Sequence, residues 1–421
     1  MSKWSFAPVR SKKAENTLAQ PSYSEQPTEK SEEMEKQCYA RLLADEYRVW
    51  GLSAQEATRK SADMLALCQS DAEAQAALKE AVETLSKGEN TVLFDQNGVP
   101  SVMVRLKAVS GAELLEGCED QTLHEVFRTD GEPLEEIWVG KYLSGRWEGA
   151  AASLPMAAPT RYPSQDEAAE DCRRKGPGWC LTPYFVRTVL SLKSLKEGTL
   201  PHGNNDKGHD YFRPQEQGTP CGEGLVLTGS GPCVWSHNGK SSGVWDMNGN
   251  LNEWDGGLRL VDGEIQYVPL RDMILDTRDA HGALPWRAMD MAGCPVAPGT
   301  AGSLHYDVTN ESICLTDQPV RPGIGNCAFQ QIALKNGLEE ADILKLRGLL
   351  PPTRDEGVVL GWRWVCAEGE RLPLSGGAYK AIDHAGAFFT GITKPREERY
   401  QLAGMRLTYV DPRRFEKGDT K

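Results

Sequence analysis

The chain has 421 residues and a formal net charge of −13; 39% of its residues are hydrophobic and 25% are charged. These values are ordinary for a globular protein, and an acidic chain without a basic cluster is a poor match for a nucleic-acid groove. No apolar run approaches the ~18 residues that a membrane span needs, and the N-terminus lacks the apolar stretch of a secretory signal. The 11 cysteines show no Cys-x-x-Cys spacing, which predicts reduced, mostly buried thiols and no zinc site.

The N-terminal part of the chain divides into a polar arm and a helical region. Residues 1–32 are rich in Ser, Glu, Lys and Pro and are predicted to form a flexible arm, because they cannot bury enough apolar surface. Residues 33–90 predict three helices, and the last carries an apolar stripe that includes Leu78 and Val82. An apolar stripe does not identify the surface against which it packs, so the helices either pack on the main domain or form a docking or oligomerisation element.

Residues 91–421 are predicted to form one loop-rich α+β domain. Ser101–Lys107 and Ile137–Tyr142 alternate apolar and polar residues, as strands do. Ser164-x-x-Glu167 is a capping box that opens a helix, and Thr182-Pro183 predicts another helix with Pro at its first position. Gly and Pro separate short segments from there to the end, which indicates long ordered loops.

The most informative segment runs from Gly243 to Trp254. Trp245 and Trp254 bracket a polar turn in which Gly249 and Asn250 tolerate positive φ. One interpretation is a tight loop that two aromatic side chains hold against the core. The other is a calcium loop, since the turn places hard carboxylate ligands around free backbone carbonyls.

This segment resembles the Asp-x-x-Gly-Asn-x-x-Glu-Trp signature of formylglycine-generating-enzyme-like domains, a branch of the C-type lectin fold. Gly376-Gly377-Ala378-Tyr379 and Gly404-Met405-Arg406 look like the closing elements of that family. Ala385-Gly386-Ala387-Phe388 and Arg396 lie where phage and prophage variable proteins carry similar residues. The resemblance covers roughly residues 91–410 and implies an α+β domain with a C-type lectin fold of the formylglycine-generating-enzyme type.

The resemblance also implies metal ligands, but it departs from the family where catalysis is concerned. The family-matched calcium donors are Asp246, Gly249, Leu251 and Glu253. The redox-active cysteines of the family lie between the two closing elements, whereas the last cysteine here is Cys366. A Cu(I) site needs thiolates, so the sequence predicts that the protein is not an enzyme and that calcium is its only candidate cofactor.

Residues 371–410 form the candidate variable segment. The resemblance implies that this segment displays a ligand-binding surface of the kind that a diversity-generating retroelement varies. Tyr400 and His384 are the predicted anchors, and Arg396 is predicted to be a framework residue that bonds backbone carbonyls. The predicted binding residues are Ala378, Lys380, Ala381, Asp383, His384, Thr390, Gly391, Thr393, Lys394, Glu397, Glu398, Arg399, Tyr400 and Gln401.

The genetic code does not decide whether a retroelement has diversified residues 371–410. Random changes in the first two bases of AAC-type codons cannot produce Lys, Glu or Gln. These residues occupy candidate positions at Lys380, Lys394, Glu397, Glu398 and Gln401. Either the template codons differ, or this copy is not diversified by that route.

The sequence therefore predicts a non-enzymatic receptor-binding protein of a phage or prophage tail, assembled in the cytoplasm and carried in the virion. Its expected partners are a protein or glycan receptor on a host cell and, through the N-terminal helices, tail proteins or further copies of the chain. The alternatives are a host-encoded surface ligand-binding protein and a divergent formylglycine-generating-type oxidase.

Overall fold

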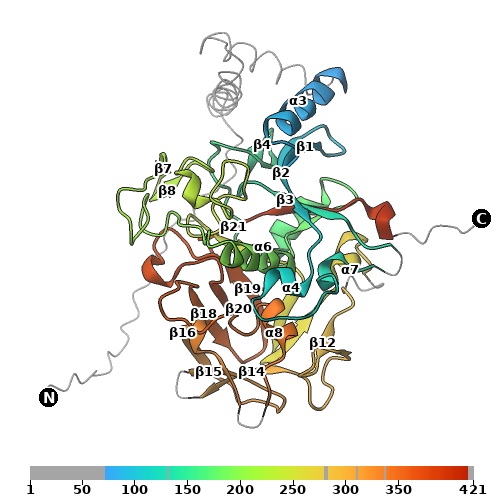
Figure 1. Cartoon of the computed structure of the whole chain (residues 1–421), viewed down its shortest axis with the longest axis vertical. Coiled ribbons are helices and arrows are strands. Elements are labelled where there is room, and N and C mark those ends of the chain that lie inside the picture. The colour runs from blue at the N-terminus through green and yellow to red at the C-terminus, as the bar shows by residue number, and fades with distance from the viewer. Residues whose placement is uncertain (1–71, 130–131, 279–282, 310–311, 336–337, 416–421) are drawn as a thin grey trace, which may run out of the picture.

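The computed structural model describes residues 72–129, 132–278, 283–309, 312–335 and 338–415. The predicted arm and the first two predicted helices lie outside these residues. In the part of the chain that is described, no helix has both the length and the apolar character to cross a bilayer. Short strands and long loops dominate this part, which confirms the predicted loop-rich α+β class (Figure 1).

The helices are few and mostly short. The α-helices are α3 (Ala72–Leu85), α4 (Gly111–Leu114), α5 (Gln165–Arg173), α6 (Tyr184–Lys196), α7 (Leu270–Ile274) and α8 (Asp342–Leu346). The 3-10 helices are η1 (Glu125–Phe127), η2 (Cys233–Trp235), η3 (Phe329–Gln331), η4 (Ile382–His384) and η5 (Pro412–Phe415).

A five-stranded sheet has the order β1-β2-β3-β22-β6, so a strand from the C-terminal end lies inside an otherwise N-terminal sheet. Its strands are β1 (Asn90–Phe94), β2 (Pro100–Lys107), β3 (Glu136–Gly140), β6 (Trp179–Leu181) and β22 (Leu407–Tyr409). Two small hairpins stand apart from it: β4 (Ser144–Trp147) with β5 (Ala150–Ser153), and β7 (Pro220–Gly222) with β8 (Leu225–Val226).

The larger sheet follows the path β16-β18-β20-β19-β10-β11-β14-β15-β17, with β9, β21, β12 and β13 branching from it. The strands of the path are β10 (Leu258–Val261), β11 (Glu264–Tyr267), β14 (His305–Thr309), β15 (Ser312–Thr316), β16 (Ile324–Ala328), β17 (Ala333–Leu334), β18 (Trp362–Cys366), β19 (Glu370–Ser375) and β20 (Thr390–Lys394). The branches are β9 (Asn252–Trp254), β12 (Arg287–Met289), β13 (Pro295–Val296) and β21 (Ala403–Met405).

Local sequence signals explain several of these elements. The strands predicted over 101–107 and 137–142 are present as β2 and β3. The Ser164 side chain accepts a hydrogen bond from the Glu167 amide and caps α5, as predicted. Pro183 does not occupy the first helical position, because its ψ of 141° is extended; it is the N-cap, and α6 begins one residue later.

Helix α3 packs on the main body of the chain. Leu78 and Val82, from its predicted apolar stripe, are buried in one cluster with Val92, Val99 and Trp147. For this helix the structure therefore supports packing on the domain, and the first two predicted helices remain untested.

Helix α6 crosses the middle of the molecule, with β1–β3 on one side of it and the strands of the larger sheet on the other (Figure 1). Apolar residues along it, including Val186, Val189 and Leu190, are buried in the main core. That core also takes in Val365 of β18 and Phe388, so the candidate variable segment lies against a packed interior.

Candidate functional site

The loop of residues 246–253, here called the acidic loop, is fastened to its neighbours through backbone and amide groups. Asn250 Oδ1 accepts hydrogen bonds from the Val226 amide at 3.1 Å and from the Asn204 side chain at 3.2 Å. Gly249 has a φ of +82°, and a Cβ there would lie 2.1 Å from the carbonyl oxygen of Asn204. The loop therefore needs glycine at this position for both its conformation and its close packing.

The acidic loop also holds the beginning of the candidate variable segment. The Gly249 amide donates to the carbonyl of Gly376 at 3.1 Å, and the Tyr379 amide donates to the carbonyl of Asn250 at 2.9 Å. Two motifs more than 100 residues apart in the sequence are thus joined by backbone hydrogen bonds.

Glu253 lies at the centre of a buried ion cluster. Arg406 donates to both of its carboxylate oxygens, at 2.8 and 3.0 Å, and Arg187 approaches one of them at 2.7 Å. Burial alone would raise the pKa of Glu253, but Arg187 and Arg406 lower it below its ordinary value. Glu253 is therefore ionised and holds β9 to the C-terminal motif and to α6.

Two further carboxyl groups, those of Asp246 and Asp255, lie near this cluster, and one oxygen of each has no hydrogen-bond partner among the described residues. Among the described residues, Asp246 Oδ1 and Asp255 Oδ1 are buried without a partner. Burial raises the pKa of Asp246 to about 6 and that of Asp255 to about 7, against an ordinary value of 3.8. The Asp255 carboxyl group accepts a hydrogen bond from the Ser375 hydroxyl.

The structure places the four predicted calcium donors in this loop but gives two of them other contacts. Asp246 accepts a hydrogen bond from the Gly229 amide at 3.0 Å, and Glu253 is bound by two guanidinium groups. No group of three or more His, Cys, Asp or Glu side chains suited to a metal ion occurs among the described residues. Calcium binding by Asp246, Gly249, Leu251 and Glu253 stays a prediction.

The predicted binding residues do not all reach the surface. Three are buried, namely Ala378, Thr390 and Gly391. Thr390 pairs with the buried Arg363 and faces the core, and the outer side of Gly391 is covered by Trp364 and Phe389. The remaining predicted residues are exposed (Lys380, Asp383, Glu397, Arg399, Gln401) or half-buried (Ala381, His384, Thr393, Lys394, Glu398, Tyr400).

Arg396 is anchored, but its partners differ from those predicted. It donates to both carboxylate oxygens of Glu370, at 2.8 and 2.9 Å, and to Asp166 at 2.6 Å. These bonds go to carboxylates and not to backbone carbonyls, because β19 and the first turn of α5 place acidic side chains beside it. Its framework role thus depends on ion pairs.

The two predicted anchors have different surroundings. The Tyr400 hydroxyl accepts a hydrogen bond from Asn252 at 3.3 Å, and the Lys394 ammonium group lies 4.6 Å from the centre of its ring. Burial raises the pKa of Tyr400. Tyr400 therefore helps to fasten its segment to β9, and it offers less free surface than a display residue would.

His384 belongs to an aromatic cluster on the outer face of the larger sheet. Its ring lies 4.1 Å from the ring of Trp362 and 6.0 Å from that of Trp364, measured between centroids. Both tryptophans are half-buried, while Arg363 and Val365 between and beyond them point inward. Neither tryptophan is among the predicted binding residues, although the alternation in Trp362–Cys366 is the signal of a half-buried strand.

Ile382 lies in the same turn as His384 and has an unusual backbone conformation. Its φ is +49°, which is rare for a β-branched residue, and its side chain is 39% exposed. The Ile382 amide donates a hydrogen bond to the carbonyl of Asn205, and the Asn205 side chain accepts a hydrogen bond from the Tyr211 amide. Tyr211 and Phe212, which contact each other edge to face, are also exposed, so apolar side chains from two loops are held by one asparagine.

The chain is thus an α+β protein with a buried ionic centre around Glu253 and an aromatic cluster around His384. No protein-family model matches the sequence, and no curated protein matches it. Among the solved structures that align with it in part is a chain described as "Major Tropism Determinant U1 Variant", at 12% identity and a TM-score of 0.26. The alignment covers 73% of this chain and 62% of that one, less than two thirds of its length. A TM-score this low assigns neither a fold nor a function to this chain.

Proposed function

We propose that this chain is a non-enzymatic receptor-binding protein of a phage or prophage tail. Its recognition surface is the aromatic patch, defined as Trp362, Trp364, Ile382 and His384, together with the exposed charged residues around it. The proposal is carried by one observation: aromatic and apolar side chains are presented to solvent by a rigid sheet and a fastened turn. Rigid aromatic rings bury contact area at low entropic cost, which is the property of recognition surfaces.

The conformation of Ile382 supports a recognition role for this turn. A bulky residue at positive φ costs on the order of 1–3 kcal/mol, and such strain concentrates at functional sites. The Asn205 carbonyl and the packing of Gly377 against Ala385 hold the turn in this shape. An exposed apolar side chain on a strained backbone adds little to the stability of the fold, but it offers a partner a contact of fixed position.

A C-type lectin fold of the formylglycine-generating-enzyme type is part of this proposal. Its support is that the three motif segments meet: the acidic loop bonds to Gly376, Trp254 pairs with Leu374, and Glu253 binds Arg406. A bracket of this kind leaves the exposed residues between Gly377 and Gly404, such as Lys380 and Asp383, free to vary. The host-encoded surface protein remains the alternative, and the gene neighbourhood separates the two, because tail genes beside this gene favour the phage assignment.

The absence of catalysis is likewise proposed on chemical grounds. No cysteine lies between Gly376 and Arg406, so this segment has no thiolate for a copper centre. Incubation with a cysteine-containing sulfatase peptide should leave the peptide unchanged in mass. Conversion of its cysteine to the aldehyde would replace the recognition proposal with the oxidase alternative.

Removal of the aromatic patch tests the proposed function. The full chain carrying Trp362→Ala and His384→Ala should melt within a few degrees of the wild type, yet its binding to host cells should fall at least tenfold. Ile324→Ala is the matched control, because Ile324 is 63% exposed on the neighbouring strand β16 but lies outside the patch.

A second variant guards against a loss of folding. Ile382→Asn removes the apolar contact and tolerates positive φ, so it should fold at least as well as the wild type and still bind weakly. Binding of both patch variants at the wild-type level would show that recognition lies elsewhere on the molecule.

A further inference from the structure

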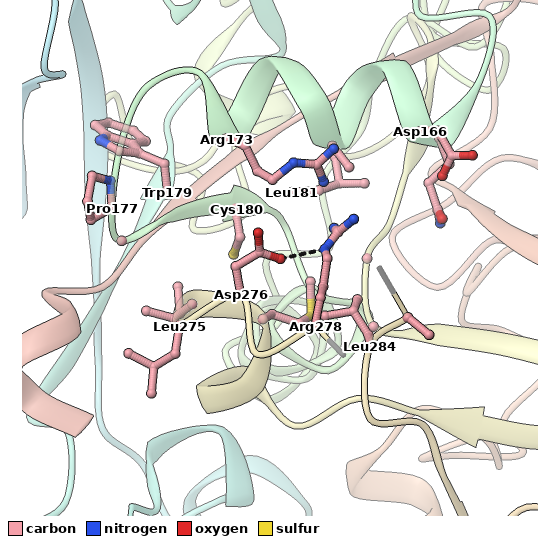
Figure 2. A pocket seen from close by; sticks show the side chains of 18 of the residues that line it. Asp166, Arg173, Pro177, Trp179, Cys180, Leu181, Leu275, Asp276, Arg278 and Leu284 are labelled. Carbon is pink, nitrogen blue, oxygen red and sulfur yellow. Dashed lines mark hydrogen bonds and ion pairs between the residues drawn. The ribbon is translucent and has the colours of Figure 1, made fainter. Parts of the chain in front are cut away.

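A cleft of about 1120 Å³ lies between α5 and the described residues 275–278 and 283–284, which follow α7, outside the aromatic patch (Figure 2). Its size is that of a small-molecule site. Part of its lining is apolar, from Cys180 and Leu181 on β6 and from Leu275 and Leu284 on the opposite wall. Another part of the lining is strongly charged, and the positions of these charges indicate which kind of ligand the cleft would bind.

Among the described residues, four arginines line the cleft, against three carboxylates. Arg396 and Arg259 are engaged with Glu370, and Arg396 also binds Asp166, so these charges compensate one another within the wall. Asp276 is engaged with Arg278 at 2.6 Å. The carboxylates of the lining are therefore all committed to guanidinium partners.

Arg173 and Arg278 have donors to spare. Figure 2 shows their guanidinium groups pointing toward each other from α5 and from the facing loop. Arg173 uses Nε and one terminal nitrogen to bind Glu170, which does not line the cleft, and Arg278 uses only Nε to bind Asp276. Within the described residues, the other terminal nitrogen of Arg173 and both terminal nitrogens of Arg278 have no hydrogen-bond partner.

Two guanidinium groups that face each other repel, and an oxyanion between them removes that repulsion. Guanidinium donors match the oxygens of phosphate, sulfate and carboxylate groups geometrically. We propose that this cleft binds a small organic anion, with its oxyanion between Arg173 and Arg278 and its apolar body against Leu181, Leu275 and Leu284.

Calorimetric titration of the full chain with phenyl phosphate tests this site. We expect saturable binding, no binding of phenol, and weaker binding of inorganic phosphate, because only phenyl phosphate supplies both the oxyanion and the apolar body. Phenyl sulfate and benzoate, titrated in parallel, identify which oxyanion the site prefers. No saturable binding of any of the three aryl anions, or equal binding of phenol and phenyl phosphate, would overturn the proposal.

The variants Arg173→Gln and Arg278→Gln should each weaken binding of phenyl phosphate at least tenfold. Arg174→Gln is the control, since Arg174 is the next residue along, has a 69% exposed side chain and does not line the cleft. Undiminished binding by the double variant would sink the assignment.

Competition in the wild-type protein provides a test that needs no variant. Inorganic phosphate at high concentration should displace phenyl phosphate, and failure to do so contradicts an oxyanion site. This cleft is separate from the aromatic patch, so host-cell binding by the patch variants gives no information about it, and the two proposals can fail independently.

Discussion

Glu253 and Arg406 lie 153 residues apart in the chain and form a bidentate ion pair in which both side chains are 1% exposed. Arg406 also donates to the carbonyls of Gly140, at 2.9 Å, and Trp245, at 2.7 Å. One guanidinium group therefore connects β9 with the end of β3 and with Trp245, directly before the acidic loop. This pair joins the acidic loop to the C-terminal end of the candidate variable segment.

Glu253→Gln should destabilise the fold by about 3–5 kcal/mol, because it leaves the guanidinium groups of Arg187 and Arg406 buried without a negative partner. Unfolding in denaturant measures the loss. Arg399→Gln is the matched control: Arg399 has a 61% exposed side chain and pairs with the exposed Glu167, so its removal should cost within about 0.5 kcal/mol. Equal effects of the two changes would show that the buried pair is not a structural centre.

Asp255 should make stability fall as pH rises. Burial raises its pKa in the folded protein to about 7, above the ordinary value of 3.8, so folding favours the protonated form. The stabilisation is complete below the ordinary pKa and is lost as pH rises through the folded value. In Asp255→Asn this dependence disappears, so stability relative to the wild type should increase by about 1 kcal/mol per pH unit between pH 4 and 7. Melting curves of both proteins across that range check the slope, and parallel curves contradict it.

The acidic loop should keep its structure without calcium. Both oxygens of Glu253 accept from guanidinium groups, and Asn250 secures the turn through Val226 and Asn204, so hydrogen bonds alone can order the loop. We expect cooperative melting in chelator, at a temperature that excess calcium raises if the predicted donors bind the ion. A calcium-dependent rise that Asp246→Asn abolishes would establish the metal site, and an unchanged melting temperature would contradict it.

Truncation of the N-terminal region should show where the folded body begins. Deletion of residues 1–71 removes only the part outside the described residues and should leave a cooperatively melting protein. Deletion of residues 1–88 also removes α3 and uncovers the cluster around Val92, Val99 and Trp147. Replacement of Leu78 or Val82 alone by Ala should lower the free energy of unfolding by about 1–5 kcal/mol, the range for buried aliphatic residues.

Light scattering on the shorter deletion separates the two roles left open for the first two helices. A fall in oligomeric mass, or loss of incorporation into the tail, assigns them to association. An unchanged mass with normal incorporation contradicts a docking role. If the deletion of residues 1–88 melts like the wild type, α3 is not part of the core.

Local chemistry in the sequence was sufficient wherever one side chain serves its own backbone. Ser164 caps α5, and Gly249 and Asn250 adopt positive φ, as the sequence predicts. Each of these outcomes depends on neighbours within a few residues, and turn and cap preferences act over that range.

Contacts between distant segments were decided only by the tertiary structure. Glu253 looks like a calcium ligand in its own loop, but the parallel pairing of β9 with β21 places it against Arg406. The sequence predicts His384 as an anchor, but only the position of β18 in the sheet places Trp362 against its ring. Sequence patterns report which face of an element is apolar, whereas the partner of a charge or a ring depends on strand order, and local propensity does not encode strand order.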